Sequence, residues 1–296
     1  MSKNYLSFGK VLTDCSPDAT GEIIIPDDVV IIDKNAFYGC DLIESVVIPD
    51  SVEEIHAKAF YMCSNLKSIK FGNGLKRIEP LTFYKCDSLE SIVIPASVEV
   101  IYLAFSECES LESIVVDPKN KVYDSRDNCN AIIETSSNKL IIGCASSSIS
   151  EGVTTVGGDS FMGCSSLTEV VIPEGVTEIG DEAFGGCSSL ESIVVDSNNK
   201  VYDSRNNCNA IIHTESNTLI AGCKNTIILE GVTRIADGAF RGCSSLTEIV
   251  IPESVTWIGN CAFWGCSSLK KVSIPERFKE REAEIFGEHT AEITYY

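Results

Sequence analysis

Hydrophobic residues recur along this chain at a regular spacing, which is 23 residues between Cys40 and Cys63. The clearest copy runs from Phe240 to Pro252 and has the pattern F-x-x-C-x-x-L-x-x-I-x-I-P. The element F-x-x-C occurs eight times, ending at Cys40, Cys63, Cys86, Cys108, Cys164, Cys187, Cys243 and Cys266. A repeat of this length predicts a stack of similar units rather than one globular core.

Each repeat predicts one short strand, a turn and a return segment. Counted from the cysteine, the apolar positions are +3, +6, +8, +12, +15 and +20, which in the first full copy are Ile43, Val46, Ile48, Val52, Ile55 and Phe60. The alternation of +6 and +8 favours a strand with one buried face. A proline often follows at +9, as in Pro95, and it predicts the end of the strand because proline lacks a backbone donor.

Two repeats are longer than the others and resemble each other closely. The cysteine spacing rises to 56 residues after Cys108 and again after Cys187, and the two blocks match at 36 of 56 positions. Both contain N-K-V-Y-D-S-R followed by C-N-A-I-I. We expect a hairpin in each block, with residues 131–134 paired to 139–142 and a second turn at 214–217.

The chain ends differ from the repeats and predict caps. We expect a single domain with an N-terminal cap at residues 1–20, repeats at 21–275 and a C-terminal cap at 276–296. The segment Glu276–Phe286 lies between Pro275 and Gly287, an order that predicts a helix. A final strand is expected at residues 293–296, because an uncapped stack would leave apolar surface and an open strand edge.

Charge and composition exclude several classes of partner. The formal net charge is −20 and the pI is near 4.5, which argues against binding to nucleic acid or to anionic membrane surfaces. The first ten residues lack the apolar segment of a signal peptide. No apolar run reaches the roughly 20 residues of a membrane helix. We therefore expect no nucleic acid and no membrane insertion, while the residues leave the localisation undetermined.

Fourteen cysteines raise the question of disulfides. Eight of them hold the same repeat position, where cysteine acts as a small buried hydrophobe. Neighbouring side chains in such a column point the same way, which is poor disulfide geometry, so we predict free thiols. Cys261 stands at +18, where other repeats carry Lys58 or Glu182, and is predicted to be exposed.

The sequence contains no recognisable catalytic or metal-binding motif. His56, His213 and His289 match no zinc spacing, and no phosphate loop or nucleophile elbow is present. The Asx-rich segments 196–199 and 203–207 lack the spaced carboxylates of a calcium loop and are interpreted as turns. We expect no enzyme activity, no cofactor and no metal.

The outward strand position, +7, predicts an apolar ridge. Its residues are Val47, Lys70, Val93, Val115, Val171, Val194, Val250 and Ser273. Serines at +5 and acidic residues at +4, among them Glu90, Glu112 and Glu191, border it. An apolar strip with a polar rim is typical of a protein-binding surface, although valine also simply favours strands. A second row, Tyr38, Tyr61 and Tyr84, either contacts a partner or packs over a repeat corner.

The segment from Cys243 to Phe263, C-S-S-L-T-E-I-V-I-P-E-S-V-T-W-I-G-N-C-A-F, resembles the 23-residue repeat of the BspA-like leucine-rich repeat family. The resemblance covers about residues 20–275. It implies a mainly β, right-handed leucine-rich-repeat solenoid with parallel strands lining one face.

The same resemblance implies a function and a location. It implies a non-enzymatic protein-binding or adhesion module, with a host or matrix protein as partner, that is secreted or held at the cell surface. The alternative is an intracellular or structural repeat scaffold without a host ligand. We expect a monomer.

Overall fold

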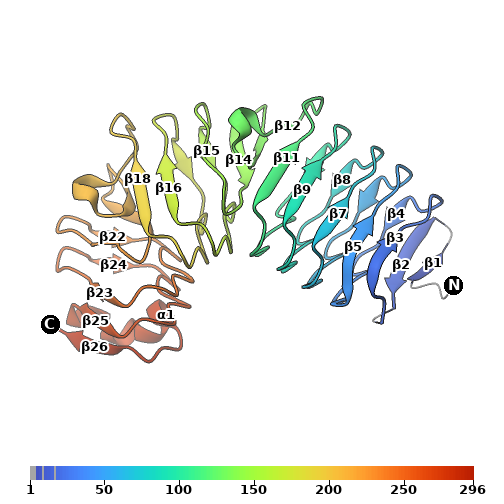
Figure 1. Ribbon diagram of the computed structural model, residues 1–296. Helices are drawn as coiled ribbons and strands as arrows, with labels where there is room; N and C mark the ends of the chain where they lie inside the picture. Colours follow the sequence, from blue (N-terminus) through green and yellow to red (C-terminus); the bar gives the residue numbers. More distant parts are fainter. Residues whose placement is uncertain (1–4, 9, 17) are drawn as a thin grey trace. The chain divides into compact units, whose positions relative to one another are not determined.

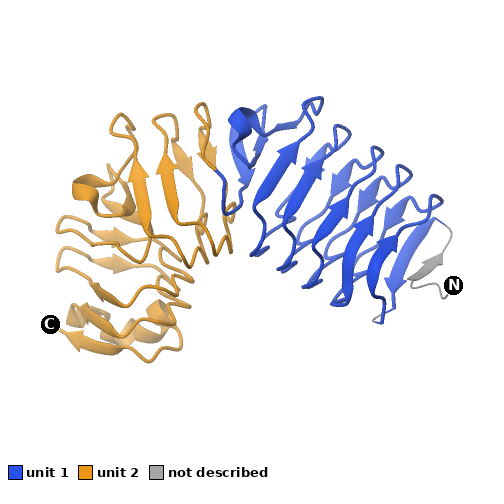
Figure 2. Cartoon of the chain, viewed as in Figure 1, with its two compact units in different colours: residues 1–147 blue, residues 148–296 orange. Residues whose placement is uncertain are grey.

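The structure is a computed structural model that describes residues 5–8, 10–16 and 18–296. The chain divides into two compact units, Met1–Ser147 and Ser148–Tyr296 (Figure 2). Each unit is a stack of turns carrying parallel strands, which confirms the predicted solenoid (Figure 1). The expectation of one domain over residues 1–296 stays a prediction.

Besides the hairpin strands of its long repeat, unit 1 contains a strand-face sheet and a return sheet. The strand-face sheet carries the predicted +6/+8 strands, all parallel: β3 (Gly21–Ile24), β5 (Ile43–Val47), β7 (Ser68–Lys70), β9 (Ser91–Ile94) and β11 (Ser113–Val116). The return sheet contains β1 (Tyr5–Phe8), β2 (Val11–Cys15), β4 (Ile31–Ile32), β6 (Glu54–Ile55), β8 (Arg77–Ile78) and β10 (Val100–Ile101). Only β1 and β2 pair antiparallel in this return sheet. Strand β9 ends directly before Pro95, as predicted.

Unit 2 repeats this plan with shorter sheets. Its strand face carries β16 (Glu169–Ile172) paired with β18 (Ser192–Val195), and separately β23 (Glu248–Val250), β25 (Lys271–Ile274) and β26 (Glu292–Tyr295). On its return side are β15 (Thr155–Val156), β17 (Glu178–Ile179), β22 (Arg234–Ile235) and β24 (Trp257–Ile258). The break between β18 and β23 falls at the second long repeat.

Stacked phenylalanines form the centre of each unit. In unit 1, the ring centroids of Phe37 and Phe60 lie 4.6 Å apart, and those of Phe60 and Phe83 lie 5.2 Å apart. In unit 2, Phe263 stacks on Phe240 at 4.7 Å. These rings are buried and nearly parallel, so each repeat completes the core of its neighbours.

The repeated cysteines support this core by hydrogen bonding as well as by packing. The thiols of Cys63, Cys86, Cys108, Cys187 and Cys266 each donate to the carbonyl of the phenylalanine one turn earlier, whereas Cys40 donates to that of Ser16. The Sγ–O distances are 3.0 Å from Cys63 to Phe37 and 3.2 Å from Cys86 to Phe60. The Sγ atom thus lies against a backbone carbonyl oxygen. Alanine at this position would not supply this donor, which explains why a thiol suits it.

Both long repeats contain the predicted hairpins. In unit 1, β13 (Ile132–Glu134) pairs antiparallel with β14 (Lys139–Ile142), and β12 (Tyr123–Asp124) pairs with β13. In unit 2, β20 (Ala210–His213) pairs antiparallel with β21 (Thr218–Gly222), and β19 (Tyr202–Asp203) pairs with β20. Short 3-10 turns, η1 (Arg126–Asn128) and η2 (Arg205–Asn207), precede the hairpins.

An asparagine anchors each long repeat to the turn before it. The side-chain amide of Asn199 donates to the carbonyls of Pro173 and Val176, at 2.8 and 2.9 Å. Its oxygen accepts the N–H groups of Val201 and Tyr202, at 2.9 and 2.8 Å. In unit 1, Asn120 makes the equivalent four bonds, to Pro95, Val98, Val122 and Tyr123.

Two further side chains of the same motif close the ends of the sheets. The Tyr202 hydroxyl accepts the N–H of Ile179 at 3.1 Å, at the end of β17. The Ser204 hydroxyl accepts the N–H of Val195 at 3.0 Å, at the end of β18. The N-K-V-Y-D-S-R segment therefore supplies side-chain caps for both sheets, which is a structural reason for its duplication.

The C-terminal helix is shorter than predicted. Residues 276–286 form a 3-10 segment, η3 (Glu276–Arg281), followed by α1 (Glu282–Phe286), which ends at Gly287 with a φ of 66°. Phe286 stacks on Phe263 at 5.2 Å, so the segment continues the phenylalanine column and need not extend further. The predicted final strand is present as β26, and the structure shows that it pairs parallel with β25. No helix of the described residues is long and apolar enough to cross a membrane.

Candidate protein-binding surface

The +7 residues lie side by side on the outer surface of the strand face. In unit 1, Val93 is in register with Val115, and in unit 2, Val171 is in register with Val194. These four valines and Val250 are exposed, with exposed fractions between 42% and 60%. Val47 is half-buried and therefore exposes less apolar surface than these five residues. The in-register pairing joins Val93 to Val115 and Val171 to Val194 as apolar pairs, while Lys70, in register with Val47, interrupts the row in unit 1.

Two members of this strip were missed in the sequence. Ile24 is in register with Val47 and is 63% exposed, and Ile227 is 64% exposed in the turn before β23. The sequence spacing could have identified both residues as equivalents of Val250. Ile24 stands two residues before a proline, and Ile227 stands five residues before a buried valine, and Val250 has both of these spacings. We define the apolar ridge as Ile24, Val93 and Val115 in unit 1 and Val171, Val194, Ile227 and Val250 in unit 2.

A polar and acidic border runs along the ridge. The +5 serines of unit 1, such as Ser45 and Ser68, are in register with one another. Glu90, Glu112 and Glu191 are all exposed. Glu191 pairs with Lys224, whereas Glu90 and Glu112 have no ion-pair partner among the residues that the structure describes. These two carboxylates are open to a cationic group of a partner.

The ridge of unit 2 contains a groove. It measures about 310 Å³ and lies between the turn Thr226–Ile228 and strands β23 and β25, with Glu248, Val250, Lys271 and Ser273 on its far wall. Its volume is at the lower end of the ~300–1,000 Å³ typical of ligand sites. It is the hollow that coincides with the predicted surface.

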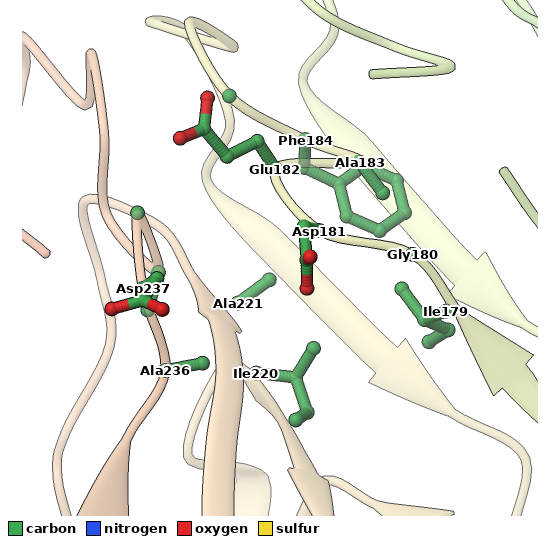
Figure 3. Close-up of a pocket in the computed structure, with 13 residues that line it drawn as sticks. Ile179, Gly180, Asp181, Glu182, Ala183, Phe184, Ile220, Ala221, Ala236 and Asp237 are labelled. Atoms are coloured by element: carbon green, nitrogen blue, oxygen red, sulfur yellow. The ribbon is translucent and has the colours of Figure 1, made fainter. Parts of the chain in front are cut away.

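A second hollow lies away from the strand face. Its volume is about 60 Å³, and it is lined by Asp181, Glu182 and Asp237 beside Ile220 and Ala221 of β21 (Figure 3). Glu182 forms an ion pair with Arg241. This volume admits a few water molecules and no organic ligand, so we interpret the hollow as space left where the hairpin enters the stack.

The tyrosine row forms a stacked ladder. The ring centroids of Tyr38 and Tyr61 lie 5.2 Å apart, and those of Tyr61 and Tyr84 lie 4.8 Å apart. Tyr38 is exposed, while Tyr61 and Tyr84 are half-buried, and Lys58 lies over the Tyr61 ring. The tyrosines therefore pack on one another, and the ladder supports the corner of the repeats.

The Asx-rich loops are organised by arginine. Arg205 donates to both carboxylate oxygens of Asp203, at 2.7 and 2.6 Å, and Arg126 does the same with Asp124. Partial burial opposes ionisation, but the bonds from Arg126 outweigh it and lower the pKa of Asp124. Within the described residues, no group of three or more His, Cys, Asp or Glu side chains could hold a metal ion.

All fourteen cysteines are free thiols, and Cys261 alone is exposed. Burial raises the pKa of the Cys108 and Cys187 thiols to about 12, so both stay protonated at neutral pH. Cys108 and Cys187 are therefore unreactive parts of the core, whereas a hydrogen bond with Cys15 lowers the pKa of the buried Cys40 thiol.

We expect native protein at pH 8 to react with one equivalent of a thiol reagent such as Ellman's reagent, at Cys261. Unfolding in guanidinium should expose all fourteen thiols. The Cys261→Ala variant is the matched control and should show almost no fast reaction. Fast labelling of several thiols in the native state would contradict the buried column.

Comparison with known proteins gives one family and several related structures. The family model described as "BspA type Leucine rich repeat region (6 copies)" matches residues 16–132, 131–223 and 220–295. No curated protein matches the chain. Among solved structures, a leucine rich cell surface protein from Faecalibacterium prausnitzii is 25% identical, with a TM-score of 0.51, over 90% of this chain and 78% of that chain.

Two further structures are more distant. The leucine-rich repeat protein of T. pallidum is 24% identical, with a TM-score of 0.36, over 98% of each chain. The pneumococcal vaccine antigen PcpA is 19% identical, with a TM-score of 0.44, over 98% of this chain and 85% of that chain.

Proposed function

This chain belongs to the BspA-type leucine-rich repeat family, and we propose that it is a non-catalytic module that binds a protein partner on the strand face. The partner covers the apolar ridge and contacts the acidic and serine border. Leucine-rich repeats of this kind are typically non-catalytic scaffolds, so the proposal assigns no reaction to the protein.

One observation carries the proposal: the most exposed aliphatic side chains line up in one column of each unit. Ile24, Ile227 and Val250 are each at least 60% exposed; Ile24 and Val250 stand at the outward strand position, and Ile227 stands in the turn beside β23. Exposed aliphatic residues arranged as a strip with a polar rim favour a protein partner over a small molecule. Strand propensity explains valine and Ile24 at the outward strand position, but it does not explain Ile227, which is exposed in a turn.

The structural comparison supports a place at the cell surface. The F. prausnitzii protein is described as a leucine rich cell surface protein. We infer that this chain likewise acts outside the cell as an adhesion module, with a host or matrix protein as its partner. Fractionation of the native cells tests this location, and recovery only inside the cell would favour the alternative of an intracellular scaffold.

Binding to immobilised fibronectin, fibrinogen, laminin and collagen tests the partner class. We expect at least one of these proteins to bind the native chain. The triple variant Val93→Lys, Val115→Lys, Val194→Lys should weaken that binding at least about tenfold, or ~1.4 kcal/mol, because it places charges in the apolar ridge.

A second triple variant controls for charge and for folding. Ala96→Lys, Thr177→Lys and Thr256→Lys add the same three charges at exposed positions outside the strand face. This control should bind as the native chain does. Equal binding by both triple variants would contradict the ridge as the contact surface.

A further inference from the structure

The backbone of β23 has one edge that pairs with β25 and one that faces the turn Thr226–Ile228. Thr247 accepts from Lys271, and Ile251 donates to Ser273 at 2.8 Å, so the odd-numbered residues here bond to β25. Because a strand directs successive backbone groups to opposite sides, Glu248 and Val250 direct theirs to the other edge.

In regular repeats this second edge is paired with the preceding turn. The N–H of Ile48 donates to the carbonyl of Lys70 at 2.9 Å, and the N–H of Ile25 donates to that of Val47 at 3.0 Å. The equivalent bond here would join Ile228 to Val250. Within the part of the chain that the structure describes, no backbone hydrogen bond joins residues 226–228 to residues 248–250.

The second long repeat causes this gap, because it holds the turn elsewhere. The N–H of Ile227 donates to the carbonyl of Cys208 at 3.0 Å, and the Thr226 hydroxyl accepts the N–H of Cys223 at 2.8 Å. The groove of about 310 Å³ lies in the space between this turn and β23. Backbone donors and acceptors of Glu248 and Val250 therefore face the groove without a partner, which is the condition for adding a strand.

We propose that the groove binds a short extended segment of the partner protein, which pairs with the free edge of β23 as an added strand. The proposal rests on the function proposed above and names the segment that this part of the surface takes. A three-residue strand is about 10 Å long, so the added segment pairs over three or four residues.

The side chains around the groove specify the segment. Its outward residues lie between Ile227 and Val250 and should be aliphatic, while its inward residue faces buried Ile228 and Ile249 and should be apolar.

Charge specifies one further residue of the segment. Glu248 is exposed and has no ion-pair partner in the described ranges, and Lys271, which is in register with it, is also in register with Glu292. One lysine thus stands in register between two carboxylates, which favours a lysine or arginine of the segment beside Glu248. On a chain of net charge −20, a cationic segment is also favoured at longer range.

The peptide acetyl-Gly-Ser-Lys-Val-Val-Val-Ser-Gly-amide has this pattern and tests the proposal by amide hydrogen exchange. In the free protein the amides of Glu248 and Val250 should exchange quickly, and that of Ile249 slowly. About millimolar peptide should slow the two edge amides at least tenfold. A peptide with N-methylated valines cannot form the ladder, and a peptide with glutamate for lysine repels Glu248, so neither should protect them.

Two protein variants keep the test independent of any one substitution. Val250→Pro removes an edge donor that β25 does not use, and it should abolish protection of Glu248. Ile227→Ser introduces the residue that the other long block carries at the equivalent place, Ser148, and it should weaken peptide binding about tenfold. No protection by the first peptide, or equal protection by the N-methylated one, would overturn the proposal.

The outcomes for the groove and for the ridge can be separated. If Val250→Pro and Ile227→Ser leave matrix-protein binding unchanged while the lysines at positions 93, 115 and 194 abolish it, the partner binds the rest of the ridge and the groove is rejected. If the peptide protects the edge but none of the four matrix proteins binds, the groove stands and the proposed partner class is rejected.

Discussion

The Phe60→Ala variant should lose about 3–5 kcal/mol of the free energy of unfolding. The Phe60 ring is fully buried and stacks between Phe37 and Phe83, at 4.6 and 5.2 Å. Its removal leaves a cavity in the middle of a column, and both neighbouring rings lose a stacking partner. Because each turn contacts only its neighbours, the surrounding turns cannot close the gap without breaking their own strand pairing.

Urea denaturation followed by two signals would measure this loss. Both tryptophans, Trp257 and Trp264, lie in unit 2, so their fluorescence reports on that unit, whereas circular dichroism reports on both. Tyr38→Ala, at the exposed end of the tyrosine ladder, is the control and should cost less than about 1 kcal/mol. A similar cost for the two variants would show that the phenylalanine column is not the core.

The same experiment tests whether the chain is one domain. If it is, Phe60→Ala in unit 1 should shift the tryptophan transition of unit 2 together with the circular dichroism. A tryptophan transition that does not move would show that the two units unfold independently and would overturn the single-domain prediction.

The Asn199→Ala variant should lose about 3 kcal/mol, although the residue lies in a loop. Its amide is buried and makes four hydrogen bonds to backbone groups. Alanine removes all four, and each buried group left without a partner costs on the order of 1–3 kcal/mol, reduced where water replaces the amide. Asn199→Asp keeps the acceptor but places a carboxylate against the carbonyls of Pro173 and Val176, so it should be as harmful at neutral pH.

The neighbouring Asn198→Ala variant is the control for this prediction, because Asn198 is exposed. It should change the free energy of unfolding by less than about 0.5 kcal/mol. Hydrogen exchange at the amides of Val201 and Tyr202 gives a local measurement, and both should exchange faster only in the Asn199 variants. Equal stability of Asn198→Ala and Asn199→Ala would rule out the proposed anchor.

Much of the fold was predictable because the same pattern of apolar positions recurs in many repeats. The +6/+8 alternation predicted the strands, and the structure places them in parallel sheets at those residues. The polar turns of four residues predicted both hairpins, because apolar runs on either side could pair only with each other. The C-terminal helix was predicted too long. Composition favoured a helix over all of residues 276–286, but the segment forms an α-helix only over its last five residues, where Phe286 stacks on Phe263.

The candidate surface was predictable only in outline. The valines at +7 are exposed where a strand's alternation places them, but whether they bind a partner stays a prediction. The roles of Asn199 and Tyr202 in closing the sheets were not visible in the sequence, because their partners lie in the preceding turn, more than 20 residues away. Local patterns show which side chains are buried and not which distant backbone groups they meet.

The sequence by itself determined the repeat length, the strand positions, the buried columns of phenylalanine and cysteine, and the family. Each of these depends on periodicity, which one chain displays many times over. Only the tertiary structure decided that Ile227 joins the ridge and that the edge of β23 is left unpaired beside a groove. The physical reason is that strand pairing is a competition between neighbours: the second long repeat binds the backbone of Ile227 through Cys208, and a turn held there cannot also pair with β23.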